Sequence, residues 1–257
     1  MDPSDAIERF LSTGTWDPAF PDWEGPLAER RRRGTATLRE ILCRVVAWRA
    51  SRAPVAIPRA PADREATIRR RLRPMLAGLF DPPDAAALIE ALPGRVSVLT
   101  PASFPAAAAT LPLATAWDLA NLLLDDLRAP PLSDDVPQLD GLCAAGRAYV
   151  LPRALAAPPG VDVLVHEAAH LLHLLPRAAL GLEPAALPIL AVPPRRRETF
   201  AYGLEAYAVC LRDGVDTIGE LGRDDARVDP ARLRALVEEA RAGGGWAVFR
   251  RYARVGR

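Results

Sequence analysis

All three histidines of this 257-residue chain lie within eight consecutive residues, at His166, His170 and His173. The segment around them, residues 161–175, is otherwise apolar except for Asp162 and Glu167 and is flanked by prolines. This pattern predicts a helix, and a helix that is apolar nearly all round is a buried one. Imidazole and carboxylate groups are costly to bury without partners. The histidines and the glutamate are therefore expected to meet a partner inside the protein.

The spacing of the sequence His166-Glu167-Ala168-Ala169-His170 suits a metal ion as that partner. Residues four apart in a helix lie on one face, so both imidazoles can reach the same ion. Glu167 lies about 100° further round the helix, given 3.6 residues per turn. From there its carboxylate can take a proton from a water molecule beside the ion and later pass it to a leaving group. The motif therefore predicts a metal site with a general base next to it.

Composition and charge exclude several other classes of function. The 33 basic and 32 acidic residues give a net charge of +1, which indicates no general attraction to nucleic acid or to an anionic membrane. Three widely spaced cysteines form neither a disulfide framework nor a CxxC metal site, and they favour a reducing compartment. No secretion signal or membrane-spanning stretch is visible in the sequence. We expect a cytoplasmic protein without nucleic-acid or membrane partners.

Periodicity predicts an α+β protein that is mostly α-helical. Helical spacing, capping residues and prolines indicate helices over residues 4–12, 27–52, 63–79, 84–92, 116–127, 161–175, 195–212, 229–241 and 246–255. Apolar alternation indicates a small sheet with strands at 95–100 and 148–152, and Pro152 suits an edge position for the second strand. Near residue 93 the sequence changes from helical patterns to the alternating pattern of the first strand. We expect an N-terminal helical region, 1–92, and a metal-binding domain, 93–257.

Residues 148–173, an edge strand followed by a loop and an apolar HExxH helix, resemble the zinc metallopeptidases called zincins. The metzincin branch needs the pattern HExxHxxGxxH, and here His173 stands where that pattern has Gly. In the gluzincin branch the third zinc ligand is a Glu on a later helix, which would be the helix predicted over residues 195–212. The resemblance implies a zinc-dependent metallopeptidase that hydrolyses peptide bonds with a metal-activated water. It extends over residues 148–212.

Two glutamates of the later helix are candidates for the third ligand. Glu198, Tyr202 and Glu205 share one face, because they stand at positions i, i+4 and i+7. The resemblance favours Glu198, since several gluzincins have a ligand Glu followed by an aromatic–Ala pair, as in residues 198–202; Glu205 is the alternative. The resemblance also gives Tyr202 a catalytic role, donating a hydrogen bond to a developing oxyanion. The thermolysin-like branch has an Asp at the position of Tyr202, so support for the metal-binding His must come from elsewhere.

The remaining site residues complete the prediction. His173 lies on the face of His166, but too far along a continuous helix to bind the same ion without distortion. It is expected either to contact the metal-binding residues without binding the ion or to pack as a hydrogen-bonded buried histidine. The expected edge strand near Tyr149 could pair with the extended backbone of a peptide or protein substrate.

Two further functions are compatible with the same motif. Two His and one carboxylate also suit non-haem iron, so a peptide-modifying oxygenase that uses Fe²⁺ and 2-oxoglutarate is one alternative to a Zn²⁺ enzyme. The run Arg195-Arg196-Arg197-Glu198 is a partial match to the Asp/Arg-rich segment of such proteins. The other alternative is a non-catalytic helical interaction protein with a structural zinc. A fourth ligand from His173 or Glu205 would support that alternative.

Overall fold

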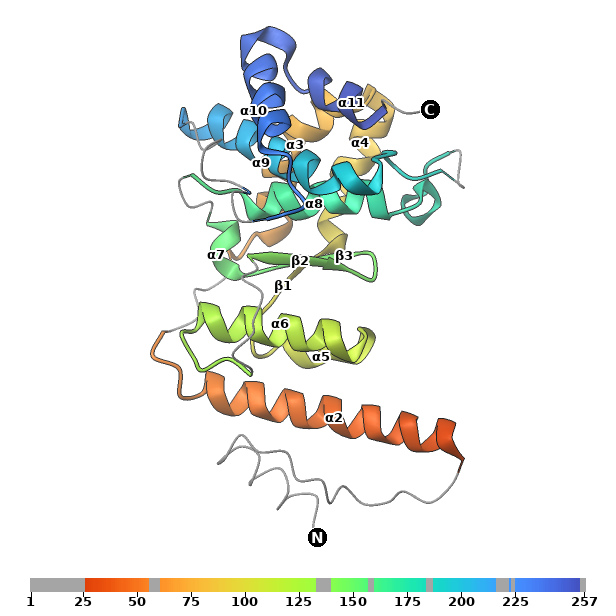
Figure 1. The fold of residues 1–257 in the computed structure, drawn as a ribbon, viewed down its shortest axis with the longest axis vertical. Helices are drawn as coiled ribbons and strands as arrows, with labels where there is room; N and C mark the ends of the chain where they lie inside the picture. Colours follow the sequence, from red (N-terminus) through yellow and green to blue (C-terminus); the bar gives the residue numbers. More distant parts are fainter. Residues whose placement is uncertain are drawn as a thin grey trace. The chain divides into compact units, whose positions relative to one another are not determined.

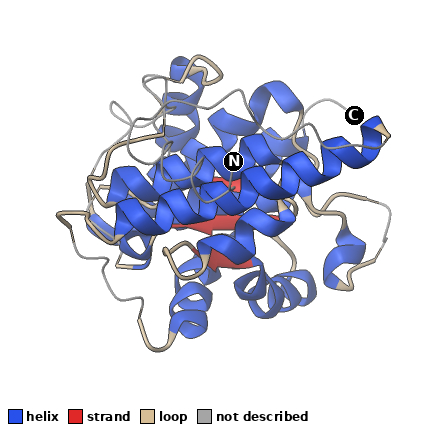
Figure 2. Ribbon diagram, turned by 90° about the horizontal axis from the view of Figure 1, so that it is seen from below, coloured by secondary structure: helices blue, strands red, loops and turns tan. Residues whose placement is uncertain are grey.

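The computed structural model of the chain describes residues 26–55, 61–132, 140–156, 160–183, 187–215, 222 and 225–254. The helix expected at residues 4–12 lies outside this part of the chain. Where the structure describes the chain, helix predominates over strand (Figure 2), which confirms the expected mostly helical α+β class. Within those ranges no helix is long and apolar enough to span a bilayer.

The order of the named helices and strands along the chain follows the predicted pattern with three additions. The helices are α2 (Leu27–Ala50), α3 (Arg64–Leu79), α4 (Pro82–Ala91), α5 (Phe104–Thr110), α6 (Leu113–Asp126), α7 (Pro152–Leu155), α8 (Val163–Leu174), α9 (Arg197–Asp213), α10 (Pro230–Glu239) and α11 (Ala247–Arg254). The strands are β1 (Val96–Val98), β2 (Gly141–Ala144) and β3 (Arg147–Val150). The sequence did not predict α5, β2 or α7.

Contacts divide the chain into two compact units, each made of two stretches of sequence. One unit comprises Met1–Ala56 and Thr100–Gln138, and the other comprises Ile57–Leu99 and Leu139–Arg257. The boundary expected between residues 92 and 93 falls inside the second unit. Helices α3 and α4 therefore belong to the same unit as the HExxH helix.

In the first unit α2 packs against α5 and α6. The apolar stripe of this helix is buried at Ile41, Leu42, Val45 and Val46. Trp48, in the last turn, is exposed, and its ring lies under the guanidinium of Arg52. The stripe thus buries the middle of α2 and leaves its last turn at the surface.

The small sheet of the second unit has the order β1-β3-β2, with β1 parallel and β2 antiparallel to β3. The prediction that β3 is an edge strand is therefore wrong, because β3 pairs on both sides. The prediction relied on Pro152, but this residue lies beyond the strand, at the start of α7. The first residue of a helix needs no backbone N–H for the helical hydrogen bonds, so a proline fits there. The strand β2 joins β3 through Ala145 and Gly146, whose φ angles of 48° and 70° are typical of a two-residue hairpin turn.

The core of the second unit lies between the sheet and its helices. Helix α8 packs against β2, β3, α3 and α9, as Figure 1 shows for the green and blue parts of the ribbon. Helix α9 packs in turn against α10 and α11. The apolar residues of α8 that are buried in this core are Leu164, Val165, Ala168, Ala169, Leu171 and Leu172. The HExxH helix is therefore central, as its apolar surface predicts.

The packing of α3 against Trp246 can be tested at Gly78. A Cβ at this position would lie 2.5 Å from the Cβ of Trp246. Alanine gains up to about 1 kcal/mol of helix propensity over glycine, whereas forcing a packed indole aside costs about 1–3 kcal/mol. We expect Gly78→Ala to lower the free energy of unfolding, measured by urea denaturation.

Gly94 offers a matched control, because a Cβ there would meet nothing within 4 Å. Gly94→Ala should leave the free energy of unfolding within about 0.5 kcal/mol of the wild-type value. A Gly78→Ala protein as stable as the wild type would contradict the described contact between α3 and Trp246.

Candidate metal centre

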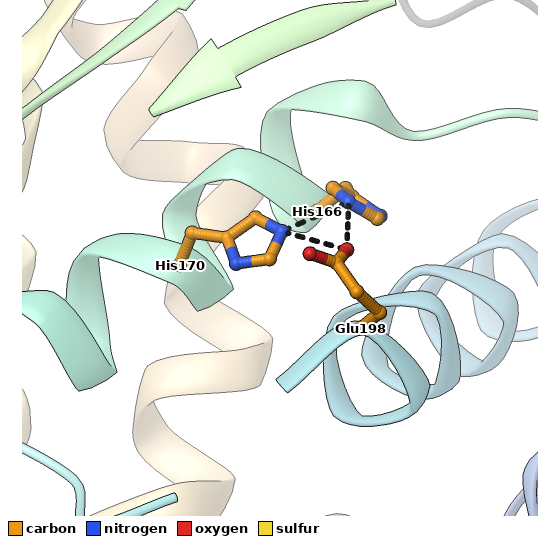
Figure 3. A group of neighbouring side chains, drawn as sticks. All are labelled: His166, His170 and Glu198. Atoms are coloured by element: carbon orange, nitrogen blue, oxygen red, sulfur yellow. Dashed lines mark hydrogen bonds and ion pairs between the residues drawn. The ribbon is translucent and has the colours of Figure 1, made fainter. Parts of the chain in front are cut away.

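Two consecutive turns of α8 and the first turn of α9 place three polar side chains together. His166 and His170 project from α8 toward the carboxylate of Glu198 on α9 (Figure 3). One ligand atom from each residue lies within 4.8 Å of the other two. Helix α8 begins at Val163, two residues after the start of the predicted range, and the carboxylate of Asp162 accepts the N–H of Val165 and caps its first turn.

The distances between these three atoms fit a metal ion. Nε2 of His170 lies 3.1 Å from Nε2 of His166 and 3.3 Å from Oε2 of Glu198. Nε2 of His166 lies 3.9 Å from the same oxygen. Ligand atoms at about 2.0–2.1 Å from a tetrahedral zinc ion stand roughly 3.3 Å apart. The three atoms therefore mark three corners of such a site with little rearrangement.

The other ring nitrogen of each histidine is also engaged. Nδ1 of His166 lies 3.1 Å from Oε2 of Glu205, a carboxylate that can only accept, so this nitrogen carries the proton. Nδ1 of His170 lies 2.9 Å from Nε2 of His173, which can accept a hydrogen bond from it. With both protons on Nδ1, the lone pairs of both Nε2 atoms would be available to a metal ion. Such contacts orient the rings of metal-binding histidines.

The two candidate third ligands therefore have different positions. Glu198 lies in the cluster with the two Nε2 atoms, and Glu205 lies behind His166. Glu205 is only 3 % exposed, and its second oxygen accepts the backbone N–H of Asp162 at 2.9 Å. In the thermolysin-like branch an Asp at the position of Tyr202 orients a metal-binding histidine. Here Glu205, one helical turn further along α9, contacts the ring of His166 instead.

Charge in the cluster favours a cation. Burial lowers the pKa of His166, but the hydrogen bond that it donates to Glu205 and the carboxylates around it outweigh burial and raise the pKa to about 9. Burial lowers the pKa of His170, and it lowers that of His173 to about 3. A proton on His166 accounts for the short contact between the two Nε2 atoms. A metal ion would place its positive charge at the same point.

Glu167 lies beside the cluster without joining it. It is 5 % exposed, and its Oε2 has no hydrogen-bond partner among the described residues. Burial raises the pKa of Glu167 to about 7; the carboxylates of Glu198 and Glu205 add to the rise and His166 opposes it. A buried carboxyl with a pKa near neutrality can accept and return a proton. The predicted role of Glu167 is compatible with this environment.

Two residues at the rim of the cluster were not found from the sequence. Nη1 of Arg227 donates to Oε1 of Glu198 at 2.9 Å, and its Nη2 donates to Asp225 at 2.7 Å. Hydrogen bonds from His170 and the charge of Arg227 lower the pKa of Glu198 despite its burial. Arg227 and Asp225 precede α10 without any recognisable motif, so only the folded chain shows their connection to Glu198.

Tyr202 packs its ring edge-on against His166, with ring centroids 4.4 Å apart. Burial raises the pKa of Tyr202 to about 12, and nearby carboxylates add to this effect. Its hydroxyl therefore keeps its proton and stays a hydrogen-bond donor. Tyr202, like Glu205 and His173, thus contacts a histidine of the cluster.

The carboxylate of Glu167 rests against the backbone of β2, and this contact can be tested at Gly141. A Cβ there would lie 2.7 Å from Cγ and 2.8 Å from Oε1 of Glu167. We expect Gly141→Ala to lower the free energy of unfolding by about 1–3 kcal/mol, measured by urea denaturation. In a Glu167→Ala background the same change should cost less, because the crowded side chain is gone. Equal costs in the two backgrounds would contradict the contact.

Comparisons with known proteins do not assign this chain to a family. Neither the models of known families, nor the curated proteins, nor the solved structures give a match. What the centre can do must therefore be derived from its own side chains.

Proposed function

We propose that this protein is a zinc-dependent peptidase. The observation that carries the proposal is the meeting of His166, His170 and Glu198 at zinc-like spacings, with the unpartnered carboxylate of Glu167 beside them. These three residues would hold the ion. A bound zinc ion supplies Lewis-acid chemistry, which activates a water molecule and polarises a carbonyl group.

The chain's own residues would transfer the proton of the attacking water and stabilise the negative charge on the cleaved carbonyl. Oε2 of Glu167 takes a proton from the attacking water and returns it to the nitrogen of the leaving amine. The hydroxyl of Tyr202 donates to the oxyanion that develops on the cleaved carbonyl. Glu205 and His173 hold the two imidazole rings through their Nδ1 atoms.

The number of ligands supports a catalytic rather than a structural ion. A structural zinc has four protein ligands, and Glu205 or His173 was the expected source of the fourth. Both residues contact Nδ1 atoms, on the far side of the rings from the cluster. Among the described residues, the cluster comprises three ligands only. Three ligands leave a position free for water and substrate.

The position of the sheet suggests how a peptide would approach. The central strand β3 cannot add a substrate strand, because both its edges are paired. The strand β2 is one of the two outer strands, and it begins at Gly141 against Glu167. An extended peptide that pairs with β2 would run beside the proposed base.

Metal content gives the first test of this proposal. We expect the purified protein to contain about one zinc ion per chain, by plasma mass spectrometry, since one set of three ligands is present. His166→Ala removes one ligand and should lose the ion. Iron after anaerobic purification would instead support the 2-oxoglutarate oxygenase. A protein that takes up neither metal on reconstitution would contradict both enzymes.

The role of Glu167 gives the second test. Glu167→Gln should keep its zinc, because this residue is not a ligand, and should lose about 10²–10⁴-fold in peptide hydrolysis, because it cannot accept the proton. The measurement is cleavage of a peptide library with the metal content determined in parallel.

Glu238→Gln, at an exposed glutamate of α10, is the matched control and should cleave at the wild-type rate. Full activity of the Glu167→Gln protein would rule out the proposed mechanism.

A further inference from the structure

A buried carboxylate at the start of α8 connects three helices. Oδ1 of Asp162 accepts the guanidinium of Arg71 from α3 and, at 3.2 Å, the N–H of Val165. Oδ2 of Asp162 accepts Nη1 of Arg212 from α9 at 2.7 Å. Asp162 therefore caps the HExxH helix and binds a cation from the helix on either side of it.

The same residue is connected to a proposed metal ligand. The backbone N–H of Asp162 donates to Oε1 of Glu205 at 2.9 Å, and Oε2 of Glu205 faces Nδ1 of His166 at 3.1 Å. The contacts run without a break from Arg71 through Asp162 and Glu205 to His166. Both oxygens of each carboxylate along this path have a partner.

Arg71 is the more deeply buried of the two guanidinium groups on this path. Its side chain is 10 % exposed, against 27 % for Arg212. Its second terminal nitrogen donates to the carbonyl oxygen of Ala154 in α7, so its planar fork holds two elements at fixed positions. Two buried carboxylates close together need such compensation, because an unpaired buried charge is strongly destabilising.

We propose that Arg71 is a positioning residue of the metal centre, which acts on His166 through Asp162 and Glu205. This inference rests on the zinc site proposed above. It makes α3 a part of the centre, although α3 precedes the expected domain boundary at residue 93. Arg71 touches neither the ion nor the substrate; it fixes the carboxylates that fix the ring of His166.

The test is the zinc affinity of the full-length protein, measured by competition with a chromophoric chelator. Arg71→Met should weaken zinc binding about 10-fold or more, the range found when the partners of metal ligands are removed. Arg177→Met is a matched control: this guanidinium is also buried and bonds to Asp84 and to the carbonyl of Glu183, but not to the centre. It should leave the affinity within about twofold of the wild type, well below the effect of removing a ligand's partner.

A double-mutant cycle separates positioning from general loosening of the fold. If Arg71 acts through Glu205, Arg71→Met should weaken zinc binding little further once Glu205→Gln is present. Arg71→Lys keeps the charge and should recover part of the affinity; it also serves if Arg71→Met does not fold. Losses that multiply in the double variant, an unchanged affinity in the Arg71 variants, or an equal loss in Arg177→Met would overturn the inference.

Failure of the underlying proposal would be recognised separately. If the wild-type protein binds no zinc, or if His166→Ala binds it as tightly, the zinc site itself is wrong and the role of Arg71 falls with it. If the wild type binds zinc through His166 and the Arg71 variants do so equally well, only the inference about Arg71 is wrong.

Discussion

The contact between Glu205 and His166 joins the two helices on which the centre depends. It sets the proton of His166 on Nδ1 and so leaves Nε2 free to face Glu198. It lies where α9 packs against α8, and the position of that packing decides which carboxylate reaches the cluster. A glutamate that is 3 % exposed is costly to bury, and the backbone of Asp162 offsets part of that cost. The polar cluster is thus supported within an otherwise apolar pair of helices.

Much of the site could be predicted because its information is local. The spacing of His166 and His170, the apolar surface of α8 and the cap at Asp162 all lie within one short segment. The choice between Glu198 and Glu205 could not be derived in this way. Both lie on the same face of α9, so only the position of α9 against α8 separates a ligand from its support. That position is set by packing and not by the period of the sequence.

The rest of the fold was harder to predict because it depends on pairs far apart in the chain. Arg71 meets Asp162 across 91 residues, and Arg227 meets Glu198 across a loop with no motif. The strand β2 was missed because it is short and its burial does not alternate. Its turn, Ala145-Gly146, carried the one usable signal, a glycine suited to a positive φ. Without β2, β3 was left at the edge of the expected sheet.

The close approach of Gly141 to Glu167 gives the proposed base an unusual neighbour. On that side the carboxylate meets the main chain of a paired strand, and a main chain cannot rotate away as a side chain can. The side chain of Glu167 therefore loses conformational freedom when the sheet forms, before any substrate binds. A general base held in this way needs no reorganisation at the moment of reaction. A glycine of the hairpin thereby limits the freedom of the residue that would do the chemistry.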